Sequence, residues 1–402
     1  MAHINGIDQF LADPARLASL AGRRIGLIGH PASLTAAGQH SLDALIHAGV
    51  HITAAFGPQH GMRGEKQDNM VESSDFVDAR HGIPVYSLYG DVRRPTPAML
   101  DSCDAFVFDL QDVGCRIYTF ITTLRYFVEA CAATGKDLIV LDRPNPAGRP
   151  IDGLRLEPGT ESFVGSAALP TRHGLTVGEL AGWFNDTLGC GTNITVVPMS
   201  GWSPESGPGY GWPLTERPWV NPSPNAASVN MTRCFPGTVL LEGTVLSEGR
   251  GTTVPLEVVG GPGIDPTRLL HTMAEIAPEW MAGALLRPCH FEPTFHKHSG
   301  ALCSGFQIHA EGTNYRHDLF KPFRLIALTL KAIRVISPGQ PLWREHAYEY
   351  EDGRLPIDVI NGGPGLRTWV DDPAASTAVL AQRLDLEAQA WLAEREPFLL
   401  YE

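Results

Sequence analysis

Short, uninterrupted apolar runs recur through the first half of this chain, and they constrain its fold more than any other feature. They predict buried strands over residues 24–29, 51–57, 83–90, 105–110 and 136–142, and a further strand over 194–199. Helical spacing predicts helices between them, over 41–49, 118–134 and, after a Thr176–Glu179 capping box, up to 188. Strands without polar alternation, separated by helices, are typical of a parallel sheet covered on both faces. The first half is therefore predicted to be α/β.

The pattern changes after a long segment rich in Gly, Pro and Trp, residues 201–228, which we expect to be an irregular loop. Trp202, Trp212 and Trp219 in this loop either stack on sugar rings or fix the loop in place. Beyond it we expect strands over 238–246 and 302–310 and helices over 266–277, 322–335 and 377–394. This mixture predicts a smaller α+β domain and a division into residues 1–236 and 237–402.

Charge and cysteine content exclude several classes of protein. A formal net charge of −13 argues against nucleic acid or an anionic membrane as the main partner. No apolar run approaches the length of about 18 residues that a membrane span needs. The amino terminus lacks the pattern of a cleaved leader, and the seven scattered cysteines contain no CxxC pair. We therefore expect a cytoplasmic protein with reduced thiols, and the oligomeric state stays open, a homodimer included.

Polar side chains follow four successive predicted strands. They are His30 after the first strand, Gln59, His60 and Arg63 after the second, Asp109, Gln111, Asp112 and Arg116 after the run at 105–110, and Asp142, Arg143 and Asn145 after the run at 136–142. Ligands of open parallel sheets bind at the carboxyl ends of the strands. The cluster therefore predicts an active site, although each residue taken singly is as well explained as a cap or turn.

The second half contributes a glycine-rich segment, residues 240–257, that contains Glu242, Glu248 and Arg250. Small residues there would let the backbone approach a ligand, and a hairpin with solvated charges is the alternative. No GxGxxG, Walker A, GxSxG or HExxH pattern occurs in a suitable context. His60, His173, His296, His298 and His309 show no metal-ligand spacing, so we predict neither a cofactor nor a metal.

A series of motifs, in order through nearly the whole chain, resembles one bacterial family, the NamZ-like exo-β-N-acetylmuramidases of glycoside hydrolase family 171. The motifs are FGPQHGMRG, GIPVYSLYG, RPTPAML, VFDLQDVGCRIYTFITTL, VLDRPNPAGRPIDG, ESFVG, RHGLTVGELA, WVNPSPN and SEGRGTTVPLE. The resemblance implies a Rossmann-like first domain, a smaller second domain and an active cleft between them. It also implies release of N-acetylmuramic acid from the non-reducing end of peptidoglycan fragments, with such a sugar as the partner.

One position departs from the family pattern. Many members have P-E-H-G where this chain has P-Q-H-G, so Gln59 replaces the glutamate that is the family's leading catalytic candidate. This chain then uses another carboxylate, uses the substrate's own N-acetyl group, acts on a different substrate, or binds sugar without cleaving it. An unrelated hydrolase or transferase built on Asp109, Asp112 and His60 is a third possibility.

Hydrolysis of a glycoside commonly needs two carboxyl groups, and arginines suit the lactyl carboxylate of muramic acid. The predicted catalytic residues are Asp109, Asp112, Glu248, Glu242 and Gln59. The predicted substrate-binding residues are His60, Arg63, Gln111, Arg116, Tyr118, Asp142, Arg143, Asn145, His173, Asn225 and Arg250.

Overall fold

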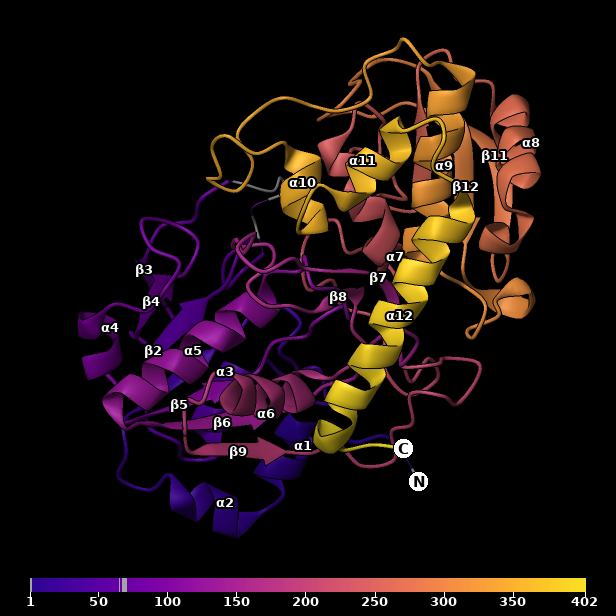
Figure 1. Ribbon diagram of the computed structural model, residues 1–402. Helices are drawn as coiled ribbons and strands as arrows, with labels where there is room; N and C mark the ends of the chain where they lie inside the picture. Colours follow the sequence, from indigo (N-terminus) through magenta and orange to yellow (C-terminus); the bar gives the residue numbers. More distant parts are fainter. Residues whose placement is uncertain (1, 65, 67–70) are drawn as a thin grey trace.

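A seven-stranded sheet forms the centre of the first half of the chain in the computed structural model, which describes residues 2–64, 66 and 71–402 (Figure 1). Neighbouring strands pair in parallel, except for the edge pair β3–β4. The order across the sheet is β3 (Phe76–Val77), β4 (Pro84–Ser87), β2 (Ile52–Gly57), β1 (Ile25–Ile28), β5 (Ala105–Phe108), β6 (Asp137–Leu141) and β9 (Ile194–Val197). The predicted α/β class with a parallel sheet is confirmed.

Helices cover both faces of this sheet. Along β5, Phe106 and Phe108 pack into the cluster formed with α5 (Phe120–Thr134) and α6 (Val177–Thr187). Ala105 and Val107 point to the opposite face, where α1 (Gly6–Leu11) and α3 (Ser41–His47) close a second cluster. Burial on both faces explains why this strand shows no polar alternation. The short helices α2 (Pro14–Ser19) and α4 (Pro97–Asp101) complete this half.

The second half packs helices against a three-stranded antiparallel sheet ordered β10, β12, β11. Its strands are β10 (Val258–Gly261), β11 (Leu285–Phe291) and β12 (Cys303–His309), and its helices are α7 (Val229–Thr238), α8 (Pro266–Ile276), α9 (Pro322–Ile336), α10 (Pro356–Asn361) and α11 (Gly365–Asp371). A small antiparallel pair, β7 (Asp152–Arg155) and β8 (Pro170–Arg172), lies between the halves, and the 3-10 turns are η2 (Pro278–Met281), η3 (Gly312–Asn314) and η4 (Glu396–Phe398).

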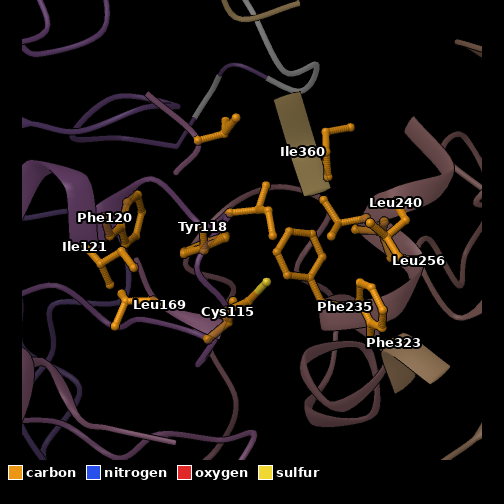
Figure 2. Packing of buried hydrophobic residues seen from close by; sticks show 14 of the residues in the cluster. Cys115, Tyr118, Phe120, Ile121, Leu169, Phe235, Leu240, Leu256, Phe323 and Ile360 are labelled. Atoms are coloured by element: carbon orange, nitrogen blue, oxygen red, sulfur yellow. The ribbon is translucent and has the colours of Figure 1, made fainter. Parts of the chain in front are cut away.

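One hydrophobic core runs through both halves. Figure 2 shows Phe235, Leu240 and Leu256 of the second half facing Cys115 and Tyr118 of the first. The Tyr118 and Phe235 rings meet edge to face, 5.8 Å between centroids. The two halves are therefore held in one fixed arrangement by shared packing.

The long helix α12 (Thr377–Arg395) returns the chain to the first half (Figure 1). The Trp391 indole donates a hydrogen bond to the carbonyl of His173 at 2.7 Å, and the Tyr401 hydroxyl donates to the Asp142 carboxylate at 2.6 Å. The division at residue 236 remains a prediction, since the last residues of the chain pack on the first half.

The expected strand over 238–246 is wrong. Helix α7 continues there into a 3-10 helix, η1 (Val239–Gly243), whose residues are all buried. A short apolar run that is buried on every side has the same pattern in a strand and in a helix, which explains the error. The other long helices and the strand near 302–310 lie where the sequence predicts them.

The loop at 201–228 contains no helix or strand, as predicted. Its three indole N–H groups donate to carbonyls of the same segment: Trp202 to Gly211, Trp212 to Arg217 and Trp219 to Ala226. The tryptophans thus fix the loop. Over the described residues, no helix is long and apolar enough to cross a membrane.

Candidate active site

A cavity lies between the two halves, where the segments after β2 and before α5 meet the chain around η1 and the turn at 348–351. Its empty space, including the part open to solvent, is about 530 Å³, and the centre of a water molecule can occupy about 50 Å³ of it. Besides apolar side chains, it is lined by Gln59, His60, Tyr118, Thr119, Ser223, Asn225, Glu242, Arg250, Tyr348 and Glu349. Both halves therefore contribute polar groups to the same space.

Glu349 is the acidic group of this cavity that is best suited to hold a proton. Its side chain is 4% exposed, and burial raises its pKa to about 7. The Tyr89 hydroxyl donates to its Oε2 at 2.8 Å and the Gln59 amide donates to its Oε1 at 3.2 Å, and both bonds oppose the effect of burial. A carboxyl group that titrates near neutrality can serve as a general acid.

Gln59 is held in one orientation. Its Oε1 accepts a hydrogen bond from the Thr119 hydroxyl at 2.7 Å, so its Nε2 is the atom directed at Glu349. The amide thus supports the carboxyl group of the second half without adding a charge. Gln59, the residue that departs from the family pattern, therefore lies directly beside another carboxyl group, that of Glu349.

Glu242 is a second carboxyl group of the cavity, with a different environment. Arg250 forms an ion pair with its Oε1, and the Tyr348 hydroxyl donates to its Oε2 at 2.6 Å. Two donors, one of them cationic, stabilise negative charge on a carboxylate. The cavity therefore combines a carboxyl group whose pKa is raised by burial with a carboxylate that is paired to a cation.

Glu248 lies behind Arg250 and does not line the cavity. Its carboxylate contacts Lys297 Nζ at 2.6 Å, Arg250 Nε at 3.2 Å and His296 Nδ1 at 3.4 Å. Burial alone would raise its pKa, but Lys297, His296 and Arg250 outweigh burial and hold the pKa well below the ordinary value. In this environment Glu248 orients Arg250 and is unsuited to donating a proton.

Several non-glycine residues at the cavity have left-handed backbone conformations. The φ angles are 71° at His60, 63° at Leu256 and 49° at Glu349, and Tyr350 follows with 66°. Such conformations cost on the order of 1 kcal/mol each and are concentrated at functional sites. Glu349 and Tyr350 are the two central residues of a turn closed by the bridge between Tyr348 and Glu351.

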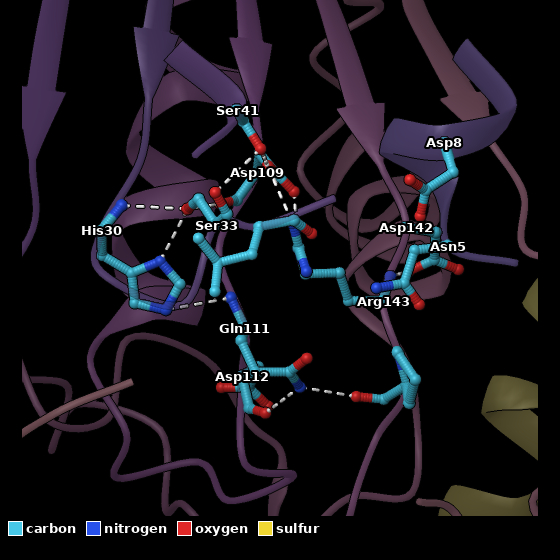
Figure 3. Close-up of polar contacts among 12 residues, drawn as sticks. Asn5, Asp8, His30, Ser33, Ser41, Asp109, Gln111, Asp112, Asp142 and Arg143 are labelled. Atoms are coloured by element: carbon cyan, nitrogen blue, oxygen red, sulfur yellow. Dashed lines mark hydrogen bonds and ion pairs between the residues drawn. The ribbon is translucent and has the colours of Figure 1, made fainter. Parts of the chain in front are cut away.

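The predicted rim at the strand ends exists, but its side chains are bonded mainly to one another (Figure 3). Arg143 donates to the Asp109 carboxylate, with Nη2 and Oδ2 at 2.9 Å, and both residues are buried. Gln111 donates to the carbonyls of Asp112 and Pro144. Gln111 and Arg143 also line a separate cavity of about 60 Å³ beside Trp212. Asp109, Gln111 and Arg143 are thus part of a packed network and do not line the cavity between the two halves.

Other predicted residues stabilise neighbouring turns. The Asp142 carboxylate accepts hydrogen bonds from the Thr176 hydroxyl and the Gly178 amide, and burial raises its pKa to about 6. The Asn145 side chain bonds the Leu175 carbonyl and the Ala147 amide. These contacts match the cap and turn roles left open for these residues.

Asp112 and His173 form a buried pair away from the cavity, with Oδ2 and Nε2 at 3.8 Å. Burial raises the pKa of Asp112 to about 7 and lowers the pKa of His173 to about 3. Arg116 donates to the carbonyls of Ile360 and Asn361, and Arg63 lies over the Phe76 ring at 4.2 Å. Of the predicted site residues, the cavity brings together Gln59, His60, Tyr118, Asn225, Glu242 and Arg250.

Sequence reasoning missed Glu349, Tyr348 and Tyr89. The segment AYEYEDG around Glu349 is typical of a polar surface loop, and its pattern does not distinguish a buried glutamate from an exposed one. Two tyrosines alternating with two glutamates were the available signal. Among the described residues, no group of three or more His, Cys, Asp or Glu side chains is arranged to hold a metal ion.

Comparisons with known proteins agree with this two-part arrangement. Residues 25–230 match the family model described as exo-beta-N-acetylmuramidase NamZ, N-terminal, and residues 233–401 match the model of its C-terminal part. The peptidoglycan beta-N-acetylmuramidase NamZ of Bacillus subtilis is 41% identical over 398 residues, covering 98% of this chain and 91% of that protein.

Two crystal structures of DUF1343-family proteins from Bacteroides fragilis have the same fold. One has a TM-score of 0.85 at 26% identity, and the other a TM-score of 0.73 at 24% identity. Each comparison covers 100% of this chain and 99% of the other.

Proposed function

Because this chain belongs to the NamZ family of exo-β-N-acetylmuramidases, we propose that it hydrolyses the glycosidic bond of a terminal N-acetylmuramic acid in peptidoglycan fragments, with Glu349 as the general acid. The observation that carries the proposal is the contrast between two carboxyl groups of one cavity. Burial raises the pKa of Glu349 to about 7, whereas Glu242 is paired with Arg250. Pairs of carboxyl groups in such different environments are typical of glycosidases.

In the proposed reaction Glu349 donates its proton to the glycosidic oxygen as the bond to the anomeric carbon breaks. The Glu242 carboxylate stabilises the positive charge that develops on the sugar ring. Three variants of its role are open: it attacks the anomeric carbon as the nucleophile, it acts as the base that activates water, or it assists while the substrate's own acetamido group attacks the anomeric carbon. Gln59 and Tyr89 orient the Glu349 carboxyl group, because Gln59 donates a hydrogen bond to its Oε1 and Tyr89 donates one to its Oε2. This chain thus keeps an acid although position 59 is an amide, which favours hydrolysis over the alternative of sugar binding alone.

Recognition of the anionic substrate is proposed to depend on Arg250. Of the four arginines predicted for the lactyl carboxylate, Arg250 lines the cavity and Arg63, Arg116 and Arg143 do not. With a net charge of −13, long-range attraction of an anion is unfavourable, so a local cation must provide the binding energy.

The setting of the reaction is also a proposal. Cytoplasmic recycling of imported fragments is supported by seven free cysteines, which suit a reducing compartment. We further propose that the catalytic groups come from two domains, residues 1–236 and 237–402. Gln59, Tyr89 and Tyr118 belong to the first, and Glu242, Arg250 and Glu349 belong to the second.

The test compares wild type with Glu349→Gln on two substrates. One is the disaccharide of N-acetylmuramic acid β-linked to N-acetylglucosamine, in which the leaving N-acetylglucosamine needs a proton. The other is the 4-nitrophenyl β-glycoside of N-acetylmuramic acid, in which the leaving nitrophenolate needs no proton. We expect Glu349→Gln to reduce kcat on the disaccharide by about 10²- to 10⁴-fold and to affect the nitrophenyl glycoside far less.

Glu351→Gln is the matched control, because Glu351 lies in the same turn and pairs with Arg354 away from the cavity. It should retain activity on both substrates. Retention of disaccharide activity by Glu349→Gln would remove Glu349 as the acid. A wild type that binds N-acetylmuramic acid but cleaves neither substrate would support the sugar-binding alternative.

A further inference from the structure

Beside Glu349 a series of stacked side chains leads from the cavity to the surface. Arg93 lies between two tyrosines, with its guanidinium carbon 4.5 Å from the centroid of the Tyr89 ring and 4.0 Å from that of Tyr350. Tyr89 packs in turn on Phe163 at 5.7 Å. Tyr89 also donates to Glu349, so the inner end of the stack contacts the proposed acid directly.

The outer end of the stack is an aromatic ring in solvent. Tyr350 is 58% exposed, and among the described residues it is the one aromatic member of the large exposed hydrophobic residues. Its ring is nevertheless held from beneath by Arg93, and its hydroxyl donates to Glu72 at 2.7 Å. An exposed ring that is fixed on one face and at its hydroxyl provides a rigid apolar platform.

The turn that carries Glu349 explains why the two groups are neighbours. Both Glu349 and Tyr350 have positive φ, at 49° and 66°, a conformation for which such turns favour Asn and Gly. The consequence is that Glu349 points inward and is 4% exposed, whereas the next residue points outward. The chain tolerates unfavourable backbone conformations and thereby places an acid and an exposed ring side by side.

The chemistry of the acid decides what this platform faces. A general acid in a glycosidase protonates the oxygen of the leaving group, so the surface just outside the acid is where the leaving sugar lies. We propose that Tyr350, supported by Arg93, binds the ring of the leaving sugar, a neutral N-acetylated hexosamine, by stacking on its apolar face. This inference rests on the proposed function and adds a binding site for the part of the substrate that departs.

Binding energy from this part of the substrate acts on the rate, because it is available while the bond breaks. Removing the Tyr350 ring should therefore reduce cleavage of substrates that have a leaving sugar. It should not affect a substrate whose leaving group is too small to reach the platform.

The experiment uses Tyr350→Gly with the muramic acid disaccharide and with the methyl β-glycoside of N-acetylmuramic acid. Methanol, like a sugar, is an alcohol that needs a proton in order to leave, but it has no ring. Glycine suits the left-handed turn, so this variant should fold at least as well as wild type. We expect kcat/KM to fall about tenfold on the disaccharide, which is the loss expected when one stacked ring is removed. On the methyl glycoside kcat/KM should stay within about twofold of wild type.

Tyr350→Phe is the matched control, because it keeps the ring and loses only the hydroxyl bond to Glu72; it should retain most of the disaccharide activity. Equal losses on both substrates, or no loss on either, would overturn the assignment of Tyr350. If wild type cleaves neither substrate, the proposed function fails and the leaving-sugar site fails with it. Cleavage by wild type followed by equal losses in Tyr350→Gly refutes the site alone.

Discussion

Gln59→Glu is the substitution that tests the cavity most directly, because it places a second carboxyl group against Glu349. Gln59 Nε2 and Glu349 Oε1 are 3.2 Å apart. With an effective dielectric constant of about 20, two ionised carboxylates at that distance repel by about 5 kcal/mol. At about 1.4 kcal/mol per pH unit, this repulsion would raise one of the two pKa values by about 4, as an upper bound.

The structure also indicates which carboxyl group would keep the proton. The Thr119 hydroxyl donates to the oxygen of residue 59 and would stabilise a carboxylate there, while burial already raises the pKa of Glu349 to about 7. Glu349 should therefore remain protonated to higher pH. The pKa of Glu349 leads us to expect an alkaline limb of the kcat/KM profile near pH 7 in wild type. In Gln59→Glu we expect this limb to move upward by about one pH unit or more.

The assay is release of N-acetylmuramic acid from the disaccharide between pH 5 and pH 9, an interval that brackets the pKa of about 7. Gln59→Met serves as the control, since it removes the amide without adding a carboxyl group, and its limb should move less. If the alkaline limb of Gln59→Glu stays at the wild-type pH or moves to lower pH, the reasoning is refuted, because the new carboxyl group would then not interact with the charge of Glu349.

Three further substitutions test individual carboxyl groups, Glu349 itself among them. The pKa of Glu349 rises from 4.5 to about 7 on folding, so the free energy of unfolding of wild type decreases as pH rises between these values. Glu349→Gln removes this effect. It should therefore stabilise the protein by about 3 kcal/mol and raise Tm at pH 8, with little gain near pH 4. Asp112→Asn should keep disaccharide turnover within a few fold of wild type, because Asp112 lies outside the cavity, and a loss comparable to that of Glu349→Gln would return it to the catalytic residues. Glu248→Gln should destabilise the protein by about 3–5 kcal/mol in urea unfolding, because it leaves Lys297 buried without its carboxylate, and an unchanged midpoint would contradict that role.

The central sheet could be predicted because its signal is local. Runs such as residues 105–108 are buried on both faces, and flanking helices and glycines limit their length. The same type of signal failed at residues 239–243, where an apolar run enters a 3-10 helix enclosed by the second half. Burial is visible in the sequence, whereas the choice between strand and helix there depends on packing partners far along the chain.

The candidate site could be predicted only in part, for a related reason. The order of strands and their polar ends indicated that Asp109, Asp142 and Gln59 would lie along one edge of the sheet. Which of them faces a cavity depends on what covers that edge, and the buried pair Asp109–Arg143 is sealed within the rim network. Glu349 is 290 positions from Gln59, and its inward direction follows from a positive φ that no sequence pattern specified.

The acid of this site is a property of the packed molecule as a whole. Glu349 comes from the second half, while its partners Gln59 and Tyr89 come from the first. Its raised pKa results chiefly from burial between the halves, and contact with water would return that pKa toward 4.5. A separated arrangement would contain the same glutamate mostly ionised at neutral pH and therefore unable to protonate a leaving group. The shared hydrophobic core around Tyr118 and Phe235 is for this reason as necessary to the proposed catalysis as the carboxyl groups themselves.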